Sequence, residues 1–178
     1  GEIALKSLNA AMSAINNKSL EDIETVAKCE KKLDDMQEAL TEFLIKVDNL
    51  SLSESQKKHI NNLFNMVTDI ERVGDHADNL SENAKYMIDN DLEFSDLGKE
   101  AFEVAINARS GDALRAVRKV NKLEDEVDML EDEMREKHIE RLSKGDCNPQ
   151  AGIAFLDIIS NLERVSDHAT NIAGYVKN

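Results

Sequence analysis

Apolar residues recur along most of this chain at alternating steps of three and four positions. That spacing places side chains on one face of an α-helix, so each regular run predicts a helix with one buried stripe. Four long runs have this pattern, at residues 26–47, 63–87, 116–134 and 158–176. Two shorter runs add one helix to each half of the chain, from Ile3 to Ile15 and from Leu97 to Ala108. The sequence therefore predicts six helices and an all-α fold.

Local signals predict that these helices are joined by short loops. Ser19 and Ser53 each begin a segment that resembles a capping box, and Pro149 fits the first position of a helix. A single Pro and no Trp in 178 residues, with a third of all residues charged, is a composition typical of long helices. No stretch resembles a long linker, so we expect one domain over residues 1–178.

A ten-residue segment occurs twice in the chain, 92 positions apart. Residues 70–79 read IERVGDHADN and residues 162–171 read LERVSDHATN. Packing alone would preserve the apolar spacing and let the polar residues change, yet Glu, Asp, His and Asn all return. The preceding long helices align at an offset of 94. We therefore expect two tandem three-helix bundles, residues 2–90 and 93–178, related by pseudo-twofold symmetry.

Each repeat carries two pairs of acidic residues with the spacing Glu-x-x-x-Asp. Residues four positions apart on a helix lie on the same face, with their Cβ atoms about 6 Å apart. Each of the four Glu residues follows a residue of an apolar stripe, so the acids border the core. We predict that eight carboxylates bind metal ions: Glu30, Asp34, Glu71, Asp75, Glu124, Asp128, Glu163 and Asp167.

The predicted ion relieves the repulsion that arises when two acidic pairs meet in a half-buried groove. Oxygen ligands suit hard cations such as Mg²⁺, Ca²⁺, Mn²⁺ or oxidised iron, and transition metals are favoured if His76 or His168 also turns inward. A histidine that packs between helices is an equally good interpretation of both. His59 and His138 are not repeated, and we expect them at the surface.

A metal-free helical interaction module is the alternative to a metal site. In that interpretation Arg72 and Arg164, which lie beside the acidic pairs in the sequence, neutralise the carboxylates directly. The duplication favours metal, because the acids are kept in both long helices of both repeats.

Charge and composition exclude several classes of partner. The chain has 22 basic and 36 acidic residues, and its formal charge of −14 repels nucleic acid and anionic lipid. No apolar stretch approaches the roughly 18 residues that a membrane span requires. Cys29 and Cys147 are too few for a disulfide scaffold, which favours a reducing, cytoplasmic setting.

Enzymatic activity has no support from the motifs. A ferritin-like di-iron oxidase requires Glu-x-x-His on two helices, and no His of this chain has Glu three residues earlier. The sequence also contains no Gly-x-Ser-x-Gly elbow, no phosphate-binding Gly-rich loop and no zincin motif. We therefore predict a protein without catalytic residues, with an oxidoreductase using a carboxylate-bound metal pair as the weaker alternative.

The duplicated three-helix unit, with two Glu-x-x-x-Asp motifs and an ERVGDHADN or ERVSDHATN signature in the repeats, resembles the PhoU family of phosphate-uptake regulators. The resemblance covers essentially the whole chain. The stretch from Cys147, CNPQAGIAFLDIISNLERVSDHATNIA, is more similar to the PhoU-type domain appended to bacterial sodium/phosphate cotransporters than to free-standing PhoU. The start at Gly1, without an initiator Met, fits a segment cut from a longer protein.

This resemblance implies a cytosolic helical regulator that controls phosphate entry and binds multinuclear clusters of iron or zinc through its Glu-x-x-x-Asp motifs. A fused domain would act on the attached transporter, at the cytosolic face of the inner membrane. A stand-alone protein would contact a phosphate ABC transporter and its sensor kinase. Gly74 of the first signature is replaced by Ser166 in the second, so the two sites need not bind the same ion. The oligomeric state is open, and the expected states include a homodimer.

Overall fold

A computed structural model describes residues 1–94 and 120–177 of the chain. These residues contain five helices: α1 (Glu2–Asn17), α2 (Leu20–Asp48), α3 (Glu54–Asp89), α5 (Val120–Lys144) and α6 (Pro149–Lys177). They contain no strand, which confirms the all-α prediction. The helix expected over residues 97–108 lies outside the described residues. The repeat boundaries 2–90 and 93–178 therefore stay a prediction. None of the five helices combines the length and the apolar composition of a membrane-spanning segment.

Helices α2, α3 and α6 begin where the sequence places their capping residues. The Ser19 side chain accepts a hydrogen bond from the backbone N–H of Asp22. Ser53 and Gln56 form a complete capping box, in which each side chain accepts from the backbone N–H of the other residue. Pro149 occupies the first position of α6, where a backbone N–H would have no acceptor within the helix. The local sequence therefore decides the starts of these helices.

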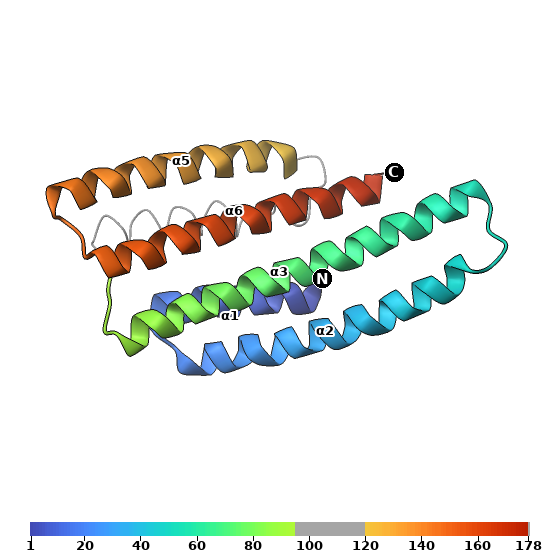
Figure 1. The fold of residues 1–178 in the computed structure, drawn as a ribbon, viewed down its shortest axis with the longest axis horizontal. Coiled ribbons are helices and arrows are strands. Elements are labelled where there is room, and N and C mark those ends of the chain that lie inside the picture. Colours follow the sequence, from blue (N-terminus) through green and yellow to red (C-terminus); the bar gives the residue numbers. More distant parts are fainter. Residues whose placement is uncertain (95–119, 178) are drawn as a thin grey trace.

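Helix α3 and helix α6 form the centre of the molecule. Helices α1, α2 and α3 pack against one another, while α6 packs against α3 on one side and α5 on the other (Figure 1). The main apolar core lies among α1, α2, α3 and α6, and its most deeply buried side chains are Ala11, Ala14, Val26, Ala77, Leu80 and Ile158. The hairpin of α2 and α3 extends beyond the N-terminus of α1.

Part of the predicted buried stripe of α2 is exposed. Val26, Cys29 and Leu33 are buried as expected, whereas Met36 is 49% and Phe43 is 60% exposed. The reason is the length of the helices, because α1 has 16 residues and α2 has 29. The expectation of one continuous buried face on α2 was therefore wrong for the half of the helix that α1 does not reach.

His138 is buried, contrary to the expectation that it lies at the surface. Only 4% of its surface is exposed, whereas His59 is exposed as expected. The ring lies so close to Gly152 that a Cβ there would be 2.6 Å from His138 Cε1, and it also packs against Phe155 with 5.4 Å between ring centroids. A helical glycine thus gives the histidine room inside the α5–α6 hairpin.

Gly74 allows α2 and α3 to approach closely beside the first Glu-x-x-x-Asp pair. A Cβ at this position would lie 2.4 Å from Leu33 Cδ1 and 3.1 Å from Glu30 Oε2. The repeat places Ser166 at the equivalent position of α6, with a side chain where Gly74 has none. The two helix pairs therefore cannot pack identically beside their acidic residues.

We predict that Gly74→Ala is less stable than the control Gly174→Ala by about 1–3 kcal/mol, because only the first change overpacks a helix contact. Both substitutions remove a helical glycine. Apart from chain neighbours and the nearby backbone of α6, no atom of the described residues lies within 4 Å of a Cβ built at Gly174. Urea unfolding measures the difference. Equal stability of the two variants would show that Leu33 moves aside without cost.

Candidate metal centre

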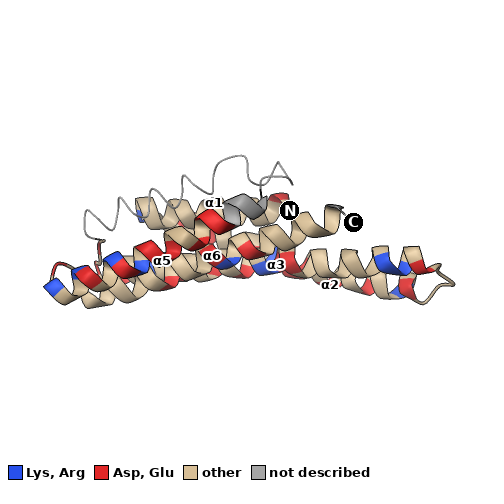
Figure 2. Ribbon diagram, turned by 90° about the horizontal axis from the view of Figure 1, so that it is seen from above, with Lys and Arg blue, Asp and Glu red and all other residues tan. Residues whose placement is uncertain are grey.

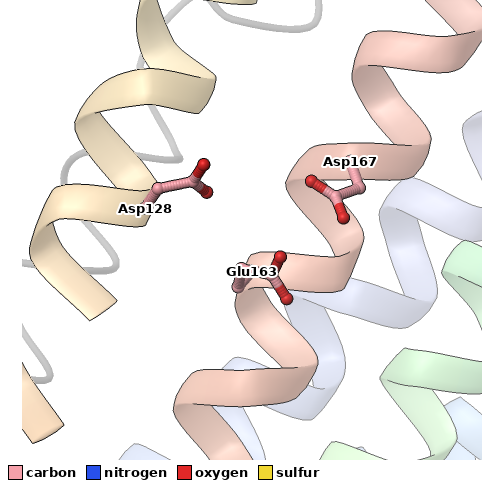
Figure 3. A group of neighbouring side chains, drawn as sticks. All are labelled: Asp128, Glu163 and Asp167. Carbon is pink, nitrogen blue, oxygen red and sulfur yellow. The ribbon is translucent and has the colours of Figure 1, made fainter. Parts of the chain in front are cut away.

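Three of the predicted metal ligands come together between α5 and α6. Asp128 on α5 points toward Glu163 and Asp167 on α6 (Figure 3). One carboxylate oxygen of each residue lies within 4.8 Å of the other two. Asp128 is exposed and the other two are half-buried. Across residues 1–94 and 125–176, no other set of three potential ligands is this compact. The fourth predicted member, Glu124, lies on α5 in a stretch whose side chains the structure does not describe.

Mutual repulsion is evident in this second acidic group, which we define as Asp128, Glu163 and Asp167. Loss of solvation raises the pKa of Asp128 and of Glu163, and the neighbouring Asp167 raises both further. Glu131 adds to the repulsion on both carboxylates, although it also pairs with Arg135 at 2.6 Å. A cation between α5 and α6 would relieve this repulsion.

The four predicted ligands on α2 and α3 form a first acidic group. The pKa of Glu30 is raised to about 7, first by burial and then by the neighbouring charges of Asp34, Asp75, Asp78 and Glu71, in that order. The pKa of Glu71 is also raised, first by burial and then by Asp75. Glu30 and Glu71 are half-buried, as is Asp75, whereas Asp34 is exposed. The negative charge therefore accumulates at the boundary of the core.

The second group has three carboxylates close enough together to hold one cation, whereas no three carboxylates of the first group lie this close together. Glu30 Oε2 is buried and has no hydrogen-bond partner, an arrangement that a bound cation or proton would satisfy. Every candidate ligand is a carboxylate oxygen, which is the donor that hard cations prefer. In the described part of the chain neither Arg72 nor Arg164 forms an ion pair with these acids. Arg72 lowers the pKa of Glu71, but by less than burial, Asp75 or Asp34 raises it.

Two acids join these groups without belonging to a Glu-x-x-x-Asp pair. Asp78 belongs electrostatically to the first group and Glu131 to the second. The repeat offsets place Thr170 and Gln37 at the equivalent positions, so neither acid is duplicated. A search for residues kept in both repeats could not find them. A search for an acidic residue one helical turn after each motif, whether or not it is repeated, would have found both.

The signature histidines lie between the halves and not in the acidic groups. His76 Nδ1 is 2.9 Å from Asn161 Oδ1, and His168 Nδ1 is 2.8 Å from Asp69 Oδ1. The two rings stack with 5.4 Å between their centroids. Because the offset of 92 relates Asp69 to Asn161 as well as His76 to His168, the two contacts are equivalent by the repeat. Each histidine thus connects its own helix to the opposite half.

Comparison with known proteins identifies the family. The chain matches the PhoU domain family over residues 1–84 and again over residues 92–176. It belongs to the PhoU domain family. This confirms the resemblance that the sequence motifs indicated. The curated relatives are described as accessory proteins, which agrees with the prediction of a protein without catalytic residues.

Two curated relatives are similar in sequence. The phosphate-specific transport system accessory protein PhoU homolog of Clostridium acetobutylicum is 25% identical over 184 residues, which cover 97% of this chain and 83% of the relative. The phosphate-specific transport system accessory protein PhoU homolog 1 of Thermotoga maritima is 26% identical over 127 residues. That match covers 66% of this chain and 54% of the relative, so the chain spans only about half of that protein's length.

Two solved structures share the fold. PhoU from Pseudomonas aeruginosa superposes with a TM-score of 0.82 at 17% identity, covering 98% of this chain and 88% of that one. The phosphate transport system regulatory protein PhoU from Streptococcus pneumoniae gives a TM-score of 0.78 at 18% identity. The match covers 98% of this chain and 86% of that one. These likenesses confirm the PhoU-like helical fold.

The raised pKa of Glu30 predicts how pH affects the stability of the metal-free protein. A carboxyl whose pKa is about 7 in the fold and 4.5 ordinarily stabilises the fold at low pH, and this stabilisation is lost as pH rises from 4.5 to 7. In the presence of a chelator, the native protein should therefore lose stability relative to Glu30→Gln over this interval. The full shift corresponds to at most about 3 kcal/mol, which partial exposure to solvent reduces.

Urea unfolding of both proteins across this pH interval measures the difference. Comparison with Glu30→Gln removes the contributions of His76 and His138, whose pKa values burial lowers and which act in the opposite direction. Parallel curves for the two proteins would contradict the assignment to Glu30.

The buried contact between Asp69 and His168 predicts a second effect on stability. Asp69→Ala should lower the free energy of unfolding by about 1–3 kcal/mol, because it leaves half-buried polar groups without their partner. The partners are His168 and the Tyr175 hydroxyl, whose pKa is raised by burial and by its hydrogen bond to Asp69. Asp69→Asn should lower the free energy of unfolding by less, because it would give His168 the same kind of partner that Asn161 is for His76. Asp35→Ala, on the exposed face of α2, should change the free energy of unfolding little. Equal effects of all three changes would reject this role.

Proposed function

We propose that this protein regulates phosphate transport from the cytoplasmic side of the membrane and that its two acidic groups bind cations. Membership in the PhoU domain family supports the first part, because the relatives are described as accessory or regulatory proteins of phosphate transport systems. The single observation that supports the second part is the convergence of Asp128, Glu163 and Asp167 from two helices.

The donor atoms favour a hard cation in each acidic group. All the candidate ligands are carboxylate oxygens, and the signature histidines are engaged between the halves. Oxidised iron, Mn²⁺, Mg²⁺ and Ca²⁺ suit such a site better than zinc does. Of the two metals that the family resemblance implies, iron is therefore the better fit.

A cation in either group would join the two helices of one hairpin. In the second group it would bind Asp128 of α5 together with Glu163 and Asp167 of α6. In the first group it would bind α2 and α3 beside the orphaned oxygen of Glu30. Because like charges repel when the sites are empty, cation binding would change how closely each hairpin packs. The surface that the hairpins present to the transport machinery would then depend on the ion.

A separate protein is favoured over a domain fused to a sodium/phosphate cotransporter. The two curated relatives are accessory proteins of phosphate-specific transport systems. By analogy, the expected partner is a phosphate-specific transport system. The membrane domain of a sodium/phosphate cotransporter is the second candidate, because residues 147–173 resemble the PhoU-type domain of those cotransporters.

We predict that cations stabilise the purified protein and that this depends on the acidic groups. At 100 times its dissociation constant, a cation that binds only the folded state adds about 2.7 kcal/mol. Loading with Fe³⁺, Mn²⁺, Mg²⁺ or Zn²⁺ should raise the Tm, and elemental analysis should show bound metal. The double variant Glu163→Gln/Asp167→Asn should lose the metal of the second group, yet should be more stable than the native protein when both are metal-free.

The matched control for this experiment is Asp35→Asn/Glu38→Gln, which removes the same charge from the exposed face of α2. It should keep both the metal and its stabilising effect. Absence of bound metal, with a Tm unmoved by all four ions, would reject the cation sites and leave the transport role standing. That role is tested separately by phosphate uptake in cells lacking the gene, which should change and be restored by the native gene. Unchanged uptake would reject it.

A further inference from the structure

A small pocket lies where the last turns of α5 meet the first turn of α6. The chain turns between the two helices at Gly145, whose φ of 74° favours glycine. His138 and Arg141 line the pocket from α5, while Ala151 and Phe155 line it from α6. Acidic positions recur along the helices, but the last turn of α5 also carries basic residues (Figure 2). The pocket therefore brings a cationic side chain of α5 to the N-terminal end of α6.

Arg141 is a buried cation without an anionic partner. Only 8% of its surface is exposed, and in the described part of the chain its Nε has no hydrogen-bond partner and no carboxylate forms an ion pair with it. Cζ lies 5.7 Å from the centroid of the Phe155 ring, and a ring accepts no ordinary hydrogen bond from the N–H donors. Glu93, the acid among the described lining residues, pairs with Lys18 at 3.1 Å. Because a guanidinium stays protonated and a buried unpaired charge is unfavourable, an anion in the pocket would stabilise it.

The start of α6 supplies a second feature that favours an anion. Asn148 accepts two of the first backbone N–H groups, that of Gln150 on its side chain and that of Gly152 on its carbonyl. Between them, the N–H of Ala151 has no acceptor among the residues that the structure describes. Ala151 is buried and lines the pocket. An unpaired N–H at the positive end of a helix of 29 residues attracts an anion.

The first repeat fills the equivalent place with apolar side chains. The offset of 94 relates Leu44 to His138, and the offset of 92 relates Ile60 to Gly152. Leu44 and Ile60 are both buried. Val47 stands at the position of the arginine. The hairpin of the first repeat thus packs without a histidine, an arginine or a glycine here, so packing alone does not account for these three residues in the second.

His138 indicates which anion fits the pocket. Burial lowers its pKa, and the charge of Arg141 lowers the pKa further. The imidazole is therefore neutral at pH 7 and has one nitrogen that accepts a hydrogen bond. Inorganic phosphate keeps a hydroxyl group at this pH and donates to such a nitrogen, whereas sulfate has no proton to donate. A pocket with these side chains favours phosphate over sulfate.

We propose that this pocket binds inorganic phosphate through the guanidinium of Arg141, the N–H of Ala151 and the ring of His138. Arginine binds phosphate oxygens with paired N–H donors, which are charge-assisted and strong. The pocket is separate from both acidic groups, since none of its described lining residues belongs to them. An anion site follows from the geometry, while the choice of phosphate as the physiological anion also rests on the proposed function.

Isothermal titration calorimetry of the native chain with inorganic phosphate tests the proposal. A chelator keeps the acidic groups free of metal, and a constant chloride concentration fixes the ionic strength. We expect one phosphate per chain, and we expect sulfate to bind about tenfold more weakly. At 100 times its dissociation constant, phosphate should raise the Tm by about 5–10 °C.

Three variants locate the binding site. Arg141→Met should weaken phosphate binding at least about tenfold, and without phosphate it should be no less stable than the native chain, because it removes an unpaired buried charge. His138→Leu, which copies Leu44 of the first repeat, should abolish the preference for phosphate over sulfate. The matched control is Lys144→Gln, which removes a positive charge from the exposed surface of the same last turn and should leave binding unchanged. Circular dichroism verifies that each variant is folded.

Several results would overturn the proposal. They are the absence of binding at up to about 10 mM phosphate, equal affinity for sulfate, and equal effects of Arg141→Met and Lys144→Gln. His138→Leu tests the pocket independently of Arg141→Met, because an unchanged preference for phosphate would place the anion elsewhere. These measurements involve neither bound metal nor phosphate uptake in cells, so failure here is distinct from failure of the proposed function.

Discussion

The contact between α3 and α6 is the interaction on which the rest of this structure depends. Leu80 and Ile158 are fully buried there, and beside them the stacked histidines each bond to the opposite half. The two central helices carry the repeated signature, so one sequence serves two purposes. Its histidines join the halves, while its acids lie toward the outer helices α2 and α5. A single helix contact therefore determines where both acidic groups lie.

The sequence predicts what depends on neighbours along one helix. The spacing of apolar residues and the caps at Ser19 and Ser53 predict the helices, and the four-residue spacing of Glu163 and Asp167 predicts carboxylates on one face. It does not predict which helix covers a stripe, and so the exposed part of α2 was missed. The contact of His168 with Asp69 was missed for the same reason, since 99 positions separate them and the repeat changes Asp69 to Asn161.

The repeats have diverged where an ion would be bound. Asp78 extends the first acidic group and Glu131 the second, and each stands opposite an uncharged residue in the other repeat. Gly74 brings α2 close to α3, whereas the second repeat has Ser166. Since both charge and helix spacing affect the affinity for a cation, the two groups would not be equivalent cation sites. Duplication supplied two scaffolds, and substitution at a few positions made them different.

The unequal contacts of the histidines also bear on how such a chain arose. A homodimer of the first repeat would place two Asp69 carboxylates beside the stacked rings, and a homodimer of the second would place two Asn161 amides there. Strict symmetry permits an even number of carboxylates only. Because both repeats belong to one polypeptide, that restriction does not apply, and Asp69 is the one buried carboxylate among the side chains that the structure describes. A twofold-symmetric dimer of either repeat could not hold a single carboxylate at this position.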